Sequence, residues 1–160
     1  MRGIAFRDFA PGDGAWIRAR HAALYAEADG FDAQFGAAVA EVLSQFEATR
    51  DPCCERAFIP LRDGQPRGSL FCTREDAQTA RLRLFLLEPE ERGQGLGRHM
   101  LGRCVAFARE AGYARIVLST HESHRAACAL YARSGWRLVA SHPVRSYGRD
   151  LVRQDWEMPL

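Results

Sequence analysis

The sequence predicts a single α/β domain in which one mixed β-sheet carries helices on both faces. Three observations support this. Some segments alternate or concentrate apolar residues as strands do, others repeat them every three or four residues as helices do, and the two kinds are interspersed. Their order along the chain is β-α-α-β-β-β-α-β-α-β-β. With 160 residues and 47% hydrophobic content, the chain is the size of one domain over residues 1–160.

The first third of the chain predicts one short strand and two helices. Residues 3–9 alternate weakly and lead into a Pro-Gly turn. A helix follows between Asp13, the expected N-cap, and Gly30, where glycine ends it. Asp32 is the expected cap of a second helix, which is broken at the Asp51-Pro52 pair.

In the middle of the chain, the spacing of apolar residues becomes that of strands. Residues 57–61 and 68–73 flank a turn and indicate a hairpin. Residues 79–88 form the longest strand-like segment, which begins as an alternation and becomes almost continuously apolar. Such a run is typical of a strand with both faces buried, so we expect this to be the central strand.

The last third predicts two more helices and three strands. Residues 96–111 are amphipathic and end at a glycine, and residues 116–118 form a short buried strand, which predicts a right-handed parallel crossover. Ser123 is the expected cap of the final helix. Two closing strands, residues 136–141 and about 151–158, complete the sheet.

Composition and charge exclude several classes of protein. The 22 basic residues, all arginine, and the 20 acidic ones are scattered in both signs, so nothing indicates a nucleic-acid or membrane partner. The absence of lysine excludes a lysine nucleophile or Schiff base. The five cysteines lack metal-ligand spacing and suit structural roles, and no metal is expected. No apolar run approaches a membrane span and no signal peptide opens the chain, so we expect a cytoplasmic monomer or homodimer.

The segment from Arg92 to Arg98, Arg-Gly-Gln-Gly-Leu-Gly-Arg, joins the central strand to a helix. A glycine-rich turn at a helix start points backbone N–H groups and the positive end of the helix dipole at one spot, as a phosphate site requires. It lacks the Lys-Ser/Thr of a P-loop and the spacing of a dinucleotide loop. The remaining pattern, Arg/Gln-x-x-Gly-x-Gly/Ala, resembles the pyrophosphate loop of the GNAT acyl-CoA N-acetyltransferases, although a simple helix cap is the alternative.

A second motif extends the resemblance to the GNAT superfamily over essentially the whole chain. Tyr131, Gly135 and Trp136 form a Tyr-x-x-x-Gly-Trp pattern at the end of the last helix, at the right distance from the glycine loop and in the right order of elements. Residues 82–89 and 146–152 also resemble acetyltransferase domains often fused to MarR-type regulators. Here we expect the domain to stand alone.

The resemblance implies a site for acetyl-CoA. In the family the strand before the loop pairs its backbone with the pantetheine arm, the loop N–H groups hold the pyrophosphate, and arginines suit its charge. His124 stands where many relatives have an asparagine that bonds to the cofactor. The residues that the resemblance assigns to acetyl-CoA are Leu86, Leu87, Arg92, Gly93, Gln94, Gly95, Leu96, Gly97, Arg98 and His124.

The resemblance also implies the chemistry, in which a neutral amine attacks the thioester directly while a backbone N–H steadies the oxyanion. Tyr131 matches the tyrosine that commonly returns a proton to the leaving thiolate, although it could also be a core residue. Arg81 and Arg83 occupy positions where some relatives carry a basic catalyst, and arginine stays protonated. The candidate bases are therefore Glu88, or His121 and Glu122.

The acceptor is the least determined part of the function. Arg83 lies in the middle of the central strand, so we expect either an internal carboxylate or a substrate carboxylate to face it. Tyr25 and Phe31 lie near the connection of the first two helices and serve either packing or substrate contact. The leading hypothesis is a small-molecule N-acetyltransferase that uses acetyl-CoA. The alternatives are a non-catalytic acyl-CoA sensor and a protein N-acetyltransferase.

Overall fold

The computed structural model describes residues 1–160 and contains one sheet, four α-helices and a short 3-10 helix. The strands are β1 (Ile4–Arg7), β2 (Arg56–Arg62), β3 (Gln65–Pro66), β4 (Gly68–Arg74), β5 (Thr79–Leu87), β6 (Arg115–His121), β7 (Arg137–Ser146) and β8 (Arg149–Pro159). The helices are α1 (Asp13–Asp29), α2 (Ala33–Thr49), η1 (Pro89–Glu91), α3 (Leu96–Glu110) and α4 (Arg125–Arg133).

The strand order β1-β2-β4-β5-β6-β8-β7 confirms the mixed sheet with β5 at its centre. Only β5 and β6 pair in parallel, on either side of α3, as the predicted crossover requires. The sequence analysis did not predict the short helix η1 or the strand β3, which pairs with the end of β2. This strand forms because Asp63 and Gly64 both adopt positive φ, at 51° and 76°, the conformation of a two-residue type I′ hairpin turn.

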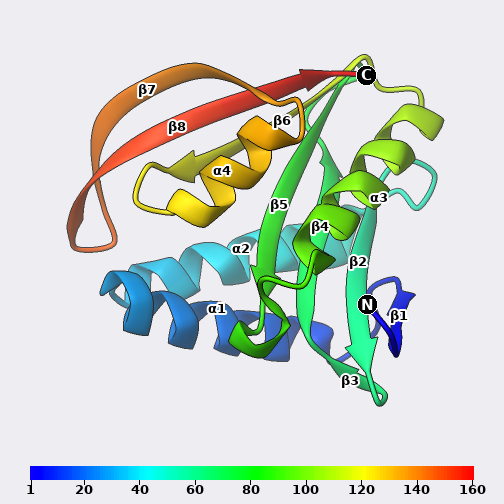
Figure 1. The fold of residues 1–160 in the computed structure, drawn as a ribbon, viewed down its shortest axis with the longest axis horizontal. Coiled ribbons are helices and arrows are strands. Elements are labelled where there is room, and N and C mark those ends of the chain that lie inside the picture. Colours follow the sequence, from blue (N-terminus) through cyan, green and yellow to red (C-terminus); the bar gives the residue numbers. More distant parts are fainter.

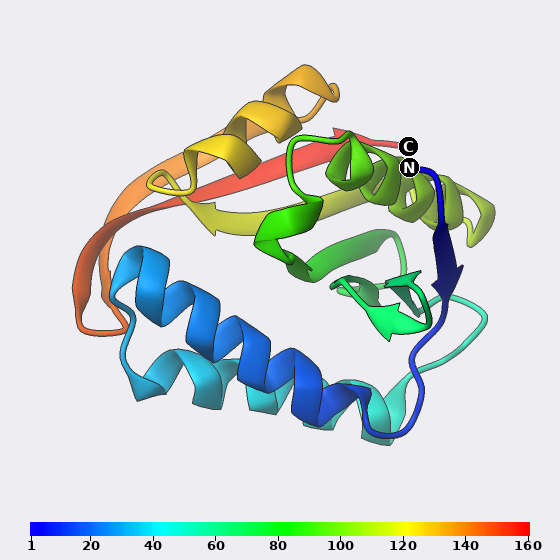
Figure 2. The same ribbon diagram turned by 60° about the horizontal axis from the view of Figure 1, so that its bottom comes forward.

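Helices cover both faces of the sheet, as predicted (Figure 2). The α1–α2 pair packs over β2, β4 and β5 through a cluster of seven buried residues that includes Ile17, Val39 and Phe71. The other face carries α3 and α4 over a cluster of 19 buried residues. No helix of the chain combines the length and the hydropathy needed to cross a bilayer.

Two of the predicted helix caps are wrong and one is confirmed. Gly12, rather than Asp13, precedes α1, because the Asp13 carboxylate accepts hydrogen bonds from Arg7 at 2.6 and 2.8 Å and from the Ala10 N–H. His124, rather than Ser123, precedes α4, without a side-chain cap. Asp32 does cap α2, since its carboxylate accepts the Gln34 N–H at 2.9 Å.

The two central strands separate after a short parallel ladder (Figure 1). Pairing runs from Thr79–Arg81 on β5 to Arg115–Val117 on β6 and then stops, although β5 continues to Leu87 and β6 to His121. Beyond that point, the side of β5 that faces away from β4 has no neighbouring strand. We call this opening the β5–β6 gap.

The far end of β7 and β8 is joined to the α1–α2 connection (Figure 1). Tyr147 and Gly148 form the hairpin tip with positive φ at both residues. The Tyr147 carbonyl accepts the Asp32 N–H at 3.1 Å, so the tip is hydrogen-bonded to the start of α2. This contact closes the outer end of the region between the helices and the separated strands.

Candidate active site

The glycine loop presents six consecutive backbone N–H groups that have no acceptor in the protein, from Gly93 to Arg98. Gly93 and Gly95 adopt positive φ, at 74° and 83°, and Gly95 directly precedes α3. An ideal Cβ on either glycine would meet no atom within 4 Å, so the space in front of the loop is open. Unpaired N–H groups at the positive end of a 15-residue helix are suited to binding an anion.

The loop lies at the mouth of the β5–β6 gap. A Cβ built on Gly97 would lie 3.5 to 3.6 Å from side-chain atoms of Leu87, Leu130 and Phe85, so the first turn of α3 lies against the end of β5 and against α4. Leu86 and Leu87 form the last two residues of β5 beside this loop. The proposed phosphate and pantetheine segments are therefore contiguous.

The two arginines of the glycine loop differ in their contacts with the protein. Arg92 donates two hydrogen bonds to the Leu87 carbonyl, at 3.1 and 2.9 Å, and so ties the loop to the end of β5. Gln94 makes a similar local bond to the Glu90 carbonyl, at 2.8 Å. Arg98 is exposed and makes no ion pair with the protein, which leaves its guanidinium free for an external anion.

Two carboxylates anchor the segment that leads into the loop. Glu88 pairs with Arg20 of α1 through bonds of 2.6 and 2.7 Å, and Glu91 pairs with Arg62 of β2 through two bonds of 2.7 Å. The Arg62 guanidinium holds the pKa of Glu91 below its ordinary value. Because both oxygens of Glu88 are occupied, this residue is poorly suited to the role of general base that the sequence suggested.

Tyr131 projects from α4 into the core with only 4% of its surface exposed. Its ring packs against Trp136 and Trp156, and its hydroxyl makes no hydrogen bond within the protein. Burial, and then the nearby Tyr25, raise the pKa of Tyr131 well above its ordinary value. The phenol therefore stays protonated at neutral pH, as a proton donor must.

Arg81 and Arg83 share the face of β5 that is turned toward α1 and α2, because the alternate residues Ala80 and Leu82 belong to the cluster under α3. Arg81 pairs with Glu75 at 2.5 Å and reaches Ser119 on β6. Arg83 is half-buried and makes neither an ion pair nor a hydrogen bond. Of the two carboxylate partners expected for it, internal or from a substrate, the internal one is therefore absent. Burial, and then the charge of Arg81, lower the pKa of Arg83.

Polar groups from β6 and β8 continue this face beyond the gap. Ser119 donates to Asp155 at 2.6 Å, and Arg153 donates to both of them. Burial of the Asp155 carboxyl opposes its ionisation, but the bonds from Ser119 and Arg153 outweigh burial and lower its pKa. Asp155 is thus an ionised partner of arginine rather than a base, and the unpaired cation of the face is Arg83.

Aromatic rings close the outer end of this face. Tyr25 stacks on Phe31 with ring centroids 5.9 Å apart, and Phe31 packs against Tyr147 of the hairpin tip at 5.1 Å. The cluster comprises His21, Tyr25, Phe31, Phe35, His121, His124 and Tyr147. Tyr25 and Phe31 are therefore packed together as a wall beside the gap. Phe35 and Tyr147 also belong to this wall, although no local sequence pattern marks them as part of it.

Three histidines of this cluster differ in their contacts. His21 donates through Nδ1 to the Ile17 carbonyl at 2.8 Å, and burial lowers its pKa to about 4, so it is neutral. His124 lies with Nε2 3.3 Å from an Asp29 oxygen, without hydrogen-bond geometry. His121 is half-buried at the end of β6, on the same face as Ser119, and burial is the largest cause of its lowered pKa.

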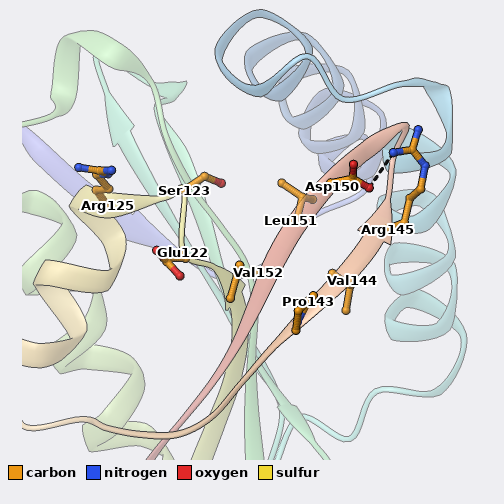
Figure 3. Close-up of a pocket in the computed structure, with 9 residues that line it drawn as sticks. All are labelled: Glu122, Ser123, Arg125, Pro143, Val144, Arg145, Asp150, Leu151 and Val152. Carbon is orange, nitrogen blue, oxygen red and sulfur yellow. Dashed lines mark hydrogen bonds and ion pairs between the residues drawn. The ribbon is translucent and has the colours of Figure 1, made fainter.

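The remaining candidate base, Glu122, lies elsewhere. It lines a hollow of about 670 Å³ between the start of α4 and the β7–β8 hairpin, shown in Figure 3. This hollow has an apolar wall that includes Val144 and Val152, and Arg145 pairs with Asp150 at its rim. None of the residues assigned to acetyl-CoA or the acceptor lines it, so Glu122 is separated from the face that carries Arg83 and His121.

Comparison with known sequences places this arrangement in a family. Residues 20–136 match the model of the acetyltransferase (GNAT) family. A mycothiol acetyltransferase from Beutenbergia cavernae is 32% identical over 80 residues, which are 50% of this chain and 27% of that protein. The chain thus matches about a quarter of the length of this curated relative.

Solved structures of low sequence identity share the fold. An acetyltransferase from Streptococcus agalactiae is 21% identical with a TM-score of 0.80 and full coverage of both chains. The yncA acetyltransferase of Salmonella typhimurium, solved with acetyl-CoA, is 20% identical with a TM-score of 0.76 over 98% of this chain and 94% of that one. Spermidine N-acetyltransferase from Vibrio cholerae, with CoA and spermine, is 14% identical with a TM-score of 0.74 over 99% and 96%. By its family match over residues 20–136 and its fold, the chain belongs to the acetyltransferase (GNAT) family.

Proposed function

We propose that this protein is an N-acetyltransferase that transfers acetyl from acetyl-CoA to the amine of a small molecule that also bears a carboxylate. The observation that carries the proposal is the row of six unpaired N–H groups from Gly93 to Arg98 at the mouth of the β5–β6 gap. Few ligand groups other than a phosphate need so many hydrogen-bond donors at one helix start. The gap beside it offers strand backbone to an extended chain.

The residues of the chain fit acetyl-CoA along this line. The N–H groups of the loop and the free guanidinium of Arg98 suit the pyrophosphate, and the backbone of Leu86 and Leu87 suits the amide groups of the pantetheine arm. Acetyl-CoA, when bound, supplies the acetyl group as an activated thioester. Its reacting end would lie in the gap, between Tyr131 on one side of the sheet and Arg83 on the other.

Two residues have the protonation states that the reaction needs. The new nitrogen–carbon bond requires a proton to leave the amine, and cleavage of the carbon–sulfur bond requires a proton to reach the sulfur. Tyr131 is a neutral phenol without another hydrogen-bond partner, so it suits the second step. His121 is a neutral imidazole on the face of the sheet that carries Arg83 and Ser119, which we call the acceptor face. It therefore suits the first step, either directly or through a water.

Arg83 supports the choice of acceptor. A half-buried guanidinium without a partner is costly, and a bound carboxylate would offset that cost with two parallel hydrogen bonds. Anchoring the acid group there would hold the amine near the thioester. The relative from Beutenbergia cavernae is named for mycothiol, but the matched part is too short to transfer that substrate to this chain.

Thiol release from acetyl-CoA over a panel of matched amines tests the proposal. Each amino acid is paired with its decarboxylated amine, and spermidine and a lysine-containing peptide are included. We expect the acid-bearing member of a pair to have the lower KM. Tight acetyl-CoA binding without turnover of any amine would favour the non-catalytic sensor, and a best acceptor that is a polycation or a peptide would overturn the assignment of the acceptor.

A further inference from the structure

One strained residue lies where the β5–β6 gap opens. Between the pairs Ser69–Leu86 and Phe71–Arg83, β4 advances two residues while β5 advances three, so β5 carries a β-bulge at Leu84 and Phe85. Leu84 adopts φ 51°, in the left-handed region that disfavours a leucine. Its side chain packs toward α1 and α2, whereas Phe85 packs toward α3 and α4.

A single side chain holds this bulge from the neighbouring strand. The hydroxyl of Ser69, which is fully buried, donates to the Leu84 carbonyl at 2.7 Å. Leu84 and Phe85 have no ladder partner on β4, so this bond replaces the regular strand pairing at the bulge. A buried hydroxyl aimed at the one strained peptide of the strand indicates that its conformation is specified rather than accidental.

The direction of the next N–H group follows from peptide geometry. In a planar trans peptide the carbonyl of one residue and the N–H of the next point in opposite directions. Ser69 draws the Leu84 carbonyl toward β4, so the Phe85 N–H points away from β4. The sheet order is β4-β5-β6, and β6 has already separated from β5 at this level. The Phe85 N–H therefore points into the β5–β6 gap.

We propose that Ser69 is a positioning residue for acetyl transfer. The family resemblance already implies that a backbone N–H steadies the oxyanion, and the new inference is that the Ser69 hydroxyl fixes the Leu84–Phe85 peptide so that the Phe85 N–H is the donor to the thioester carbonyl oxygen. This rests on the proposed function. The carbonyl oxygen gains negative charge as the amine attacks, and a donor already fixed in place stabilises that charge without rearrangement. Ser69 touches neither substrate and acts only through the backbone.

The test compares Ser69→Ala with a matched control on the same two strands. Thr73 donates through Oγ1 to the Arg81 carbonyl at 3.0 Å, in the regular part of the β4–β5 ladder, so Thr73→Val removes an equivalent bond away from the bulge. We expect Ser69→Ala to lower kcat about tenfold or more, with the Kd of acetyl-CoA changed by less than about threefold. Thr73→Val should leave kcat unchanged.

Infrared spectroscopy detects the hydrogen bond from the Phe85 N–H to the thioester carbonyl without turnover. In infrared difference spectra of bound acetyl-CoA labelled with carbon-13 at the acetyl carbonyl, a donated hydrogen bond lowers the carbonyl stretching frequency. We expect this shift in the parent and in Thr73→Val, and its loss in Ser69→Ala. Ser69→Cys, with a weaker donor, replaces Ser69→Ala if the alanine variant does not fold.

A second substitution supplies a rescue. Glycine adopts φ near 51° without strain, so Ser69→Ala combined with Leu84→Gly should recover part of both kcat and the frequency shift. Unchanged kcat and an unchanged shift in Ser69→Ala would overturn the role of Ser69, as would an equal loss in Thr73→Val. Failure of the parent protein itself to bind acetyl-CoA would instead overturn the proposed function, and this inference with it.

Discussion

Arg20 on α1 and Glu88 at the end of β5 form a bidentate pair, with Nε and Nη2 of the arginine 2.6 and 2.7 Å from the two carboxylate oxygens. The two residues are 68 positions apart in sequence. Their pair fixes the residue that precedes η1 and the glycine loop, while the Glu88 N–H also donates to the Arg67 carbonyl at 2.9 Å. The first helix therefore helps to hold the candidate phosphate site in place.

Replacing Arg20 with methionine should loosen the glycine loop. The Glu88 carboxylate would remain largely buried without its partner, at a cost of about 1–3 kcal/mol in the free energy of unfolding. We expect acetyl-CoA affinity to fall several-fold as well. Urea denaturation and calorimetry measure the two effects, and Arg18→Met, at an exposed position two residues away, is the control. Equal behaviour of the two variants would argue against the anchoring role.

Gly95→Val should abolish tight acetyl-CoA binding. Gly95 adopts φ 83° and its N–H is one of the six unpaired donors, so a branched side chain would strain the turn and enter the open space before α3. We expect affinity measured by calorimetry to fall at least about tenfold. Gly102→Ala in the middle of α3, where an added Cβ meets nothing, should bind normally. Parent-like affinity in Gly95→Val would refute the loop assignment.

Tyr131→Phe should separate catalysis from packing. The hydroxyl makes no hydrogen bond within the protein, so its removal should hardly change the free energy of unfolding. Loss of the proton donor should lower kcat about 10²-fold or more at unchanged acetyl-CoA affinity. The control is Tyr113→Phe, which removes a bond from the tyrosine hydroxyl to the Cys54 carbonyl at 2.9 Å and should lower stability but not kcat. A normal kcat in Tyr131→Phe would leave Tyr131 with a packing role only.

The order of elements was predictable because it depends on local signals. The period of apolar residues marked each helix and strand, and Gly30 and Gly112 ended helices where positive φ was required. The glycine loop was also predictable, because the spacing of its arginine and glycines is a local signal. Errors arose where a side chain had two possible partners: Asp13 bonds Arg7 across the turn instead of acting as N-cap, and no local signal distinguishes the two.

The acceptor face was less predictable because tertiary contacts build it. The sequence marked Arg83 and Glu88 as candidates. It could not show that Glu88 forms an ion pair with Arg20. Nor could it show that Glu75 pairs with Arg81, so that Arg83 remains unpaired. The bulge at Leu84 leaves no trace in the sequence, since leucine is a poor residue for positive φ. The register of β4 against β5 and the positive φ of Leu84 reveal it in the structure.

Arg83→Met should alter the selection of acceptors. The methionine retains most of the apolar stem and removes the guanidinium, so KM should rise at least about tenfold for an amine bearing a carboxylate and change little for its decarboxylated partner. Steady-state kinetics on matched pairs measure the difference. Arg74→Met, at the exposed end of β4, is the control. Equal effects on both members of a pair would show that Arg83 does not bind the acid group.

The pH dependence of the reaction should identify the base. Burial, and then the charges of His124, which precedes α4, and of Arg153 on β8, lower the pKa of His121, while Asp29 on α1 acts in the opposite direction. A base works in its neutral form, so activity is present above this pKa and is lost as the pH falls through it. The acid limb of kcat should therefore have its midpoint below about 6.5, the ordinary value for histidine.

Substitution of His121 tests that assignment directly. His121→Gln keeps a polar side chain of similar size without a titrating group in this range, so it should lower kcat about 10²-fold and remove the acid limb below 6.5. His142→Gln, at an exposed position on β7, should retain both the rate and the limb. If kcat of His121→Gln still fell in the same acidic pH range, another group, or the acceptor amine itself, would be the one that titrates in that range. His121 would then be a residue of the aromatic wall, alongside Phe31 and Tyr147.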